Sequence, residues 1–259
     1  MGLIDIAVSA VFAITALVLH ELAHIFAVNY LGGKVERVRP FPLGLMARFR
    51  GLERLCAWER YVIYGAGSFA NAVVAAWAFS VSYLSYFGVL WLERLAFFNL
   101  VLCIFNLLPV LPLDGGRILR QFLANRIGVL RANRVLLRLG AAVSLCLMIL
   151  GMVQVILYNY NVTLLCAAIY IRRQNRDMKP TLQMEFFQVL AAKRERTRAR
   201  LVPVKKVEIS ESASVKYAME RLTMDYFTEF CFYEGGALHE IALIEHVLED
   251  GVRGRVGDV

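Results

Sequence analysis

Two histidines and a glutamate lie close together in an apolar stretch near the amino terminus, where ionisable groups are costly. His20 and His24 are four residues apart, and Glu21 directly follows His20. On a helix, residues four apart share one face, so both imidazoles can converge on one cation with Glu21 beside a metal-bound water. Imidazole and carboxylate ligands suit zinc, and a catalytic zinc keeps one position for water. The pattern predicts a zinc centre with a general base. The alternative is a polar cluster that only packs against another helix.

The elements that position these groups are predicted to be membrane-spanning helices. Hydrophobic residues make up 59% of the 259 and charged residues 19%, against about 45–50% and about 25% in soluble domains. Four apolar segments have about the 20 residues that a helix needs to cross a bilayer: 3–31, 61–87, 95–111 and 140–158. A fifth, 162–171, is short, and it is predicted to be a span because only a tight turn at 159–161 separates it from the fourth. We expect an α-helical polytopic membrane domain over 1–172, a basic linker over 173–200 and a small α/β domain over 201–259.

Basic residues predict the orientation of these spans. Seven Lys and Arg lie in 34–60, six in 113–138 and nine in 172–200, each in excess of the acidic residues. Because cytoplasmic loops are enriched in basic residues, the amino terminus is expected outside and the carboxy terminus in the cytoplasm. The net charge of +8 follows from this topology, and the linker is suited to anionic lipid. Residues 201–259 hold eleven acidic and six basic residues, so no nucleic-acid partner is expected.

A zinc centre needs a third protein ligand, and the carboxylates at the membrane edges are the candidates. Asp5 and Glu93 are predicted at the outer face, whereas Asp114 follows the third span at its cytoplasmic end. His20 and His24 lie in the cytoplasmic half of the first span, so depth selects Asp114. His239 and His246 belong to the tail and are interpreted as ordinary surface or half-buried histidines.

Two further segments complete a recognisable pattern. One is Gly67-Ser68-Phe69-Ala70-Asn71, and the other is Asn106-x-x-Pro109-x-x-x-x-Asp114-Gly115-Gly116, whose prolines and glycines break the helix. Together with His20-Glu21-x-x-His24 they resemble the site-2 protease family of intramembrane metallopeptidases. The family has Gly-Pro-x-x-Asn in the middle element, and Ser68 stands in place of the proline.

The resemblance implies a function and roles for these residues. One Zn²⁺ per chain would be held by His20, His24 and Asp114, with Glu21 as the general base. Asn71 and Asn106 would either donate to substrate or oxyanion, or satisfy the backbone of broken helices. The expected reaction is hydrolysis of a peptide bond in a membrane-associated protein near the cytoplasmic face. The alternative is a catalytically silent scaffold or metal-binding regulator whose tail recruits partners.

Within the family, the chain most resembles the sporulation branch that processes pro-sigma-K. This implies a bacterial cell membrane, specifically the one surrounding the forespore, a pro-transcription factor as substrate and a membrane protein as inhibitor. Residues 34–60 are predicted to be irregular, serving either as a gate beside the site or as a plain connector.

The tail is predicted to alternate strands and helices. Strands are expected at 202–207 and 229–233, a helix at 215–224 and a further segment at 241–248, an order similar to a single cystathionine-beta-synthase (CBS) repeat. Such repeats usually pair, which implies a homo-oligomer, and they often bind ATP or another adenine nucleotide. Leu243 and His246 hold the positions of the usual nucleotide contacts, so nucleotide binding and docking of a substrate or partner both stay open.

Overall fold

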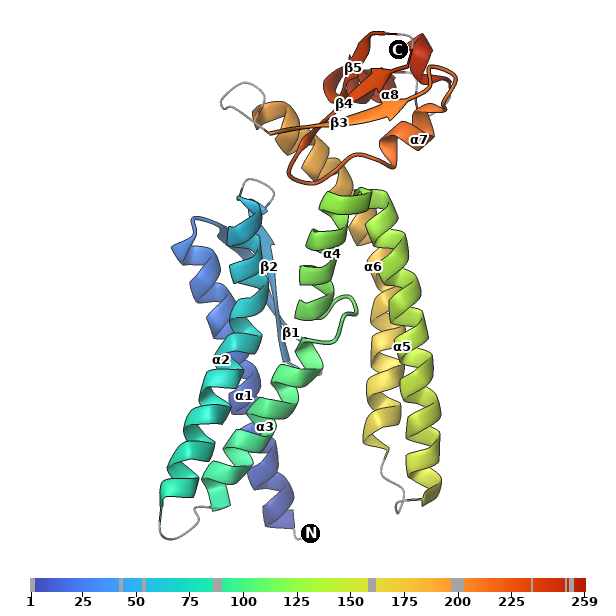
Figure 1. Cartoon of the computed structure of the whole chain (residues 1–259). Helices are drawn as coiled ribbons and strands as arrows, with labels where there is room; N and C mark the ends of the chain where they lie inside the picture. The colour runs from blue at the N-terminus through green and yellow to red at the C-terminus, as the bar shows by residue number, and fades with distance from the viewer. Residues whose placement is uncertain are drawn as a thin grey trace. The chain divides into compact units, whose positions relative to one another are not determined.

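The chain is mostly helical in the computed structural model (Figure 1). The structure describes residues 3–41, 44–52, 55–85, 90–157, 162–196, 203–233, 235–249, 251 and 254–259. They form two compact units, one of Met1–Pro109 with Leu113–Ile118, and one of Val110–Pro112 with Leu119–Val259. Helix α4 (Asp114–Ile127) is continuous and contributes its first residues to the first unit. The predicted domains at 1–172, 173–200 and 201–259 stay a prediction.

Three helices build most of the first unit: α1 (Leu3–Tyr30), α2 (Ala57–Leu84) and α3 (Leu90–Asn106). They pack against one another in all three pairings. Uninterrupted apolar sequence favours helix in a membrane, because a helix satisfies every backbone hydrogen bond within itself. Gly32, at φ 81°, follows the end of α1 in a left-handed conformation that favours glycine.

A hairpin connects α1 to α2 where an irregular loop was predicted, and that prediction is wrong for this part of the segment. Strand β1 (Lys34–Phe41) pairs antiparallel with β2 (Gly44–Arg50). Val35 and Phe49 of the hairpin pack beside Val28 and Ile63 in a small core. The strands are thereby attached to the helix that carries both histidines.

Three helices are long and apolar enough to cross a membrane among the described residues: Ala7–Tyr30, Ala57–Leu84 and Val129–Leu157. These correspond to the first, second and fourth predicted spans. The third predicted span is shifted, because α3 has 17 residues and ends at Asn106, before the prolines. The fifth lies at the start of α6 (Thr163–Arg196). Large apolar side chains such as Phe26, Phe79 and Ile149 are exposed on these helices, as lipid-facing surfaces require.

Close helix packing in the second unit joins α5 (Val129–Leu157) to α6. A Cβ at Gly151 would lie 2.8 Å from the backbone nitrogen of Leu165, and one at Gly140 would lie 2.7 Å from Oδ1 of Asn175. Small residues at such positions let membrane helices approach closely. The predicted turn at 159–161 lies outside the described residues.

The tail is a three-stranded sheet with two short helices. Strand β3 (Val204–Ile209) pairs parallel with β4 (Phe227–Phe232), which pairs antiparallel with β5 (Ala237–His239). Helix α7 (Val215–Met219) follows β3, α8 (Glu240–Glu249) follows β5, and a 3-10 helix η2 spans Val256–Asp258. The predicted α/β character is present, with the extra strand β5 and a helix that ends at Met219, five residues before the predicted end.

The tail does not close a core of its own. Its buried residues, including Leu222, Phe230 and Leu243, form one hydrophobic cluster with Ala124 of α4 and Val129 of α5, together with residues near the end of α6. Polar contacts reinforce this packing. The Lys193 ammonium of α6 donates to Glu240 Oε1 at 2.6 Å and to the Tyr226 carbonyl at 2.9 Å, and the Asp225 carboxylate accepts from Gln121 at 2.6 Å.

Candidate metal centre

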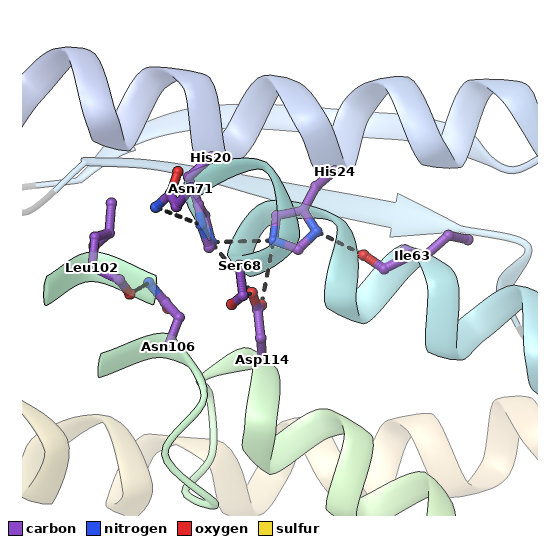
Figure 2. Close-up of polar contacts among 8 residues, drawn as sticks. All are labelled: His20, His24, Ile63, Ser68, Asn71, Leu102, Asn106 and Asp114. Atoms are coloured by element: carbon purple, nitrogen blue, oxygen red, sulfur yellow. Dashed lines mark hydrogen bonds and ion pairs between the residues drawn. The ribbon is translucent and has the colours of Figure 1, made fainter. Parts of the chain in front are cut away.

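Three buried side chains from two elements converge in the first unit (Figure 2). His20 and His24 lie one turn apart on α1, and their Nε2 atoms are 3.2 Å apart. Asp114, the first residue of α4, places Oδ2 3.4 Å from Nε2 of His20 and Oδ1 3.3 Å from Nε2 of His24. The structure therefore brings together the two histidines and the carboxylate that depth selected in the sequence.

The spacing of these atoms fits a metal ion. Ligand atoms about 2.0–2.1 Å from a tetrahedral zinc are separated from one another by about 3.3 Å. The two Nε2 atoms are 3.2 Å apart, and they lie 3.4 Å and 3.3 Å from Oδ2 and Oδ1 of Asp114 respectively. Each separation is close to that edge length, with both carboxylate oxygens facing the histidines. Among the described residues, His20, His24 and Asp114 form the one group of three or more potential ligands. All three are at most 4% exposed. Burying several acceptor atoms together without a partner costs free energy, and a shared cation would offset that cost.

A backbone carbonyl orients the ring of His24. Nδ1 of His24 lies 2.7 Å from the carbonyl oxygen of Ile63 in α2, so Nδ1 carries the proton and donates it. The lone pair of Nε2 is then directed at the centre, as a metal ligand needs.

An amide occupies the corresponding place beside His20. Nδ2 of Asn71 lies 3.4 Å from Nδ1 of His20, and Asn71 Oδ1 is buried with no hydrogen-bond partner among the described residues. A 180° rotation of the amide exchanges these two atoms. Oδ1 then accepts from Nδ1–H, and Nε2 of His20 is left for the metal. Asn71 is thus placed to orient His20.

Gly67 makes room for both imidazoles. A Cβ at this position would lie 2.4 Å from Nε2 of His24 and 2.6 Å from Nε2 of His20. Helix α2 can approach the metal-binding face of α1 so closely only because residue 67 has no side chain.

Gly115 has a similar role at the start of α4. A Cβ there would lie 2.1 Å from the carbonyl oxygen of Leu107, in the turn that follows α3. The close approach of these two backbone segments sets the position of Asp114 next to Gly115.

The other predicted site residues have different surroundings. Glu21 is half-buried on α1 and is not one of the clustered ligands. The Asn106 amide donates to the Leu102 carbonyl at 3.0 Å, which favours the backbone-satisfying interpretation of that residue. Asp5 pairs with Arg94 at 3.2 Å, and Glu93 accepts from Ser82 at 3.3 Å.

Sequence reasoning missed two polar contacts of the centre. One is the Ile63 carbonyl, since a backbone group carries no sequence signal. The other is Ser68, whose hydroxyl donates to Oδ2 of Asp114 at 2.9 Å. Its departure from the family motif was visible in the sequence, but its partner was not.

A buried His-His-Asp cluster among apolar helices indicates a membrane protein with side chains that could hold a metal ion. A family model described as Peptidase family M50 matches residues 88–148. The chain is 27% identical over 168 residues to a zinc metalloprotease of Methanocaldococcus jannaschii, covering 64% of this chain and 47% of that protein. It is 26% identical over 150 residues to stage IV sporulation protein FB of Bacillus subtilis, covering 58% and 51%.

The fold leads to the same group of proteins. The solved site-2 protease from Methanocaldococcus jannaschii matches with a TM-score of 0.55 and 26% identity, over 66% of this chain and 77% of that one. These comparisons support the resemblance of the chain to the site-2 protease family of membrane metalloproteases. The chain spans about half the length of the curated relatives named above, at 47% and 51%.

Proposed function

We propose that this chain is an intramembrane zinc endopeptidase that cleaves a membrane-associated protein near the cytoplasmic face. The observation that carries the proposal is the convergence of three buried side chains whose facing nitrogen and oxygen atoms are 3.2–3.4 Å apart, close to the ligand spacing around a tetrahedral zinc. His20, His24 and Asp114 would hold one Zn²⁺ per chain. Bound there, zinc supplies a Lewis acid that polarises a peptide carbonyl and acidifies a water molecule.

Glu21 is proposed as the group that moves the proton. It directly follows His20 on α1, it is not among the clustered ligands, and it is half-buried. A carboxylate beside an acidified water takes a proton and later delivers it to the leaving amine. Asn71 orients His20 through its amide oxygen, and its NH₂ group then becomes a candidate donor to substrate or oxyanion. Asn106 is proposed to cap the broken backbone at the end of α3.

The test separates proteolysis from a silent scaffold or metal-binding regulator. Glu21→Gln in the purified full chain should keep one zinc per chain, measured by elemental analysis. It should lose cleavage of a reconstituted single-span test protein, followed by mass spectrometry of the fragments. Glu93→Gln is the matched control, because Glu93 is an exposed carboxylate in the first turn of α3. Undiminished cleavage by Glu21→Gln would refute the mechanism. Asp114→Asn should release zinc.

The topology is proposed to comprise about five spans, with α3 and the start of α6 crossing together with α1, α2 and α5. The amino terminus would lie outside and the tail in the cytoplasm of a bacterial cell. The excess of basic residues in 34–60, 113–138 and 172–200 supports this orientation.

The substrate is proposed to be a pro-transcription factor with a membrane-associated pro-segment, of the pro-sigma-K type, cleaved in the membrane around a forespore. Similarity to a protein named for stage IV of sporulation supports this branch. A membrane inhibitor protein belongs to the same proposal. Co-purification with the Glu21→Gln protein would identify the uncleaved substrate.

The tail is proposed to be a single CBS-like repeat. The parallel β3–β4 pair with α7 between the strands supports the likeness. Pairing of two tails into a homo-oligomer, and binding of ATP or another adenine nucleotide, are the associated proposals. Light scattering and isothermal titration with ATP on the full chain would test them.

A further inference from the structure

A serine hydroxyl from α2 contacts the carboxylate of the metal centre. Oγ of Ser68 lies 2.9 Å from Oδ2 of Asp114 (Figure 2). Ser68 is 2% exposed and Asp114 is 4% exposed. A hydroxyl that donates to a buried, ionised carboxylate forms a charge-assisted hydrogen bond, which is about twice as strong as a neutral one.

This contact is unusual for a serine in the middle of a helix. Such a hydroxyl commonly donates to a carbonyl of its own helix, three or four residues earlier. Ser85, at the end of α2, does this with the carbonyl of Val81 at 2.7 Å. Ser68 instead donates across to the first residue of α4. Its hydroxyl therefore links two elements that must hold ligands of the same ion.

The position of the hydroxyl restricts how Asp114 can turn. Oδ2 receives the Ser68 hydrogen bond, whereas Oδ1 is directed at His24 Nε2 at 3.3 Å. Rotation of the carboxylate would break the charge-assisted bond inside a buried site, at the desolvation cost of an unpaired polar group. One lone pair of Oδ2 is occupied, and the remaining lone pairs stay available to a metal.

We infer that Ser68 is a positioning residue that pre-orients the Asp114 carboxylate for metal binding, which rests on the zinc centre of the proposed function. Proline, which the family motif has at this place, offers neither this hydroxyl nor a backbone N–H to α2. Serine at this position thus leaves α2 (Ala57–Leu84) unbroken and also places a hydroxyl at the metal centre. Outer partners of metal ligands change metal affinity by about 10- to 100-fold when removed.

The experiment measures zinc affinity of the purified full chain by competition with a chromophoric chelator. Ser68→Ala should weaken binding about 10- to 100-fold, and Ser68→Thr, which keeps a hydroxyl, should restore it. Ser82→Ala is the matched control, because Ser82 is also buried in α2 and donates to a carboxylate, Glu93, at 3.3 Å. The control should bind zinc like the wild type. Thermal unfolding of the metal-free proteins checks that each variant folds.

Cobalt provides a second readout that does not depend on activity. The visible absorption of bound Co²⁺ depends on the number and geometry of its ligands, so Ser68→Ala should change the spectrum and Ser68→Thr should restore it. Wild-type zinc affinity and an unchanged cobalt spectrum in folded Ser68→Ala would overturn the role of Ser68 alone. Equal weakening by Ser82→Ala would also overturn it. Absence of zinc binding by the wild type would instead overturn the proposed function and this inference together.

Discussion

Replacing Gly67 by alanine tests the geometry of the metal centre with a single methyl group. The added Cβ would lie 2.4 Å from Nε2 of His24 and 2.6 Å from Nε2 and Cε1 of His20. Nε2 is the atom of each ring that faces the proposed metal, and Cε1 of His20 is bonded to it. Ala is otherwise favoured over Gly in a helix interior by about 0.5–1 kcal/mol, so the backbone of α2 does not oppose the change.

The size of the effect follows from these distances. Ordinary contact with a Cβ begins at 3.4 Å, so the His24 ring must retreat by about 1.0 Å and the His20 ring by about 0.8 Å. Zinc–ligand distances tolerate about 0.2 Å. The His24 ring cannot move freely, because Nδ1 is held by the Ile63 carbonyl at 2.7 Å. We expect zinc affinity to fall on the order of 100-fold or more, with proteolysis lost in parallel.

The assay compares zinc content and chelator competition for the wild type, Gly67→Ala and Gly65→Ala in the purified full chain. Gly65 lies in the same helix, and a Cβ there would meet nothing within 4 Å. Gly65→Ala should therefore keep wild-type affinity and equal or greater thermal stability. If Gly67→Ala holds zinc as tightly as Gly65→Ala, the packing of α2 onto the two histidines is not as described.

Three further predictions concern other parts of the chain. Gly115→Ala should release zinc and lower thermal stability, because its Cβ would lie 2.1 Å from the backbone oxygen of Leu107; unchanged zinc content and melting temperature would contradict this. Lys193→Met should destabilise the second unit by about 3–5 kcal/mol in denaturant unfolding, since it leaves Glu240, 1% exposed, without its cation; adding Glu240→Gln should recover part of the loss. Burial raises the pKa of Glu220, but two arginines of α5 outweigh burial and leave this pKa below its ordinary value. The stability that the ionised Glu220 contributes above its unfolded-state pKa is therefore lost as the pH falls through its folded-state pKa. Glu220→Gln should flatten that acid-side loss in thermal melts.

The convergence of His20, His24 and Asp114 was predictable because these residues follow simple rules of spacing. His20 and His24 are four residues apart in an apolar helix, which places them on one face. Asp114 was selected by depth in the membrane and by the prolines and glycines around it. Neither argument needs the path of the chain between the two segments.

The role of Gly67 could not be read from the sequence, because it depends on how closely α2 approaches α1. The same holds for Ser68, whose partner lies 46 residues away. Such contacts are set by tertiary packing, and a local pattern carries no information on them.

The hairpin of residues 34–50 escaped prediction for a local reason. Its register shifts between Val35 and Arg37, and a bulge of this kind breaks the alternation of side chains by which strands are found. Pro40 adds to the irregular appearance, although proline is tolerated at the edge of a sheet.

The end of α7 differs from prediction because tertiary contacts replace helical ones. The Leu222 carbonyl accepts from the backbone N–H of Val129 at 2.9 Å, and Asp225 binds side chains of α4. Residues after Met219 are therefore bonded to other elements. Local propensity is a weak determinant against such contacts.

The hydrophobic cluster shared by the tail and helices α4, α5 and α6 can be completed only late in the synthesis of the protein. Ala124 of α4 and Val129 of α5 belong to the same buried cluster as residues as late in the chain as Val256. At about 5–20 residues per second, the ribosome needs on the order of 10 s to add the intervening stretch. During this delay the ends of α4 and α5 keep their apolar surface uncovered. A nascent chain that ends before Val256 therefore lacks part of the hydrophobic cluster to which α4 and α5 contribute.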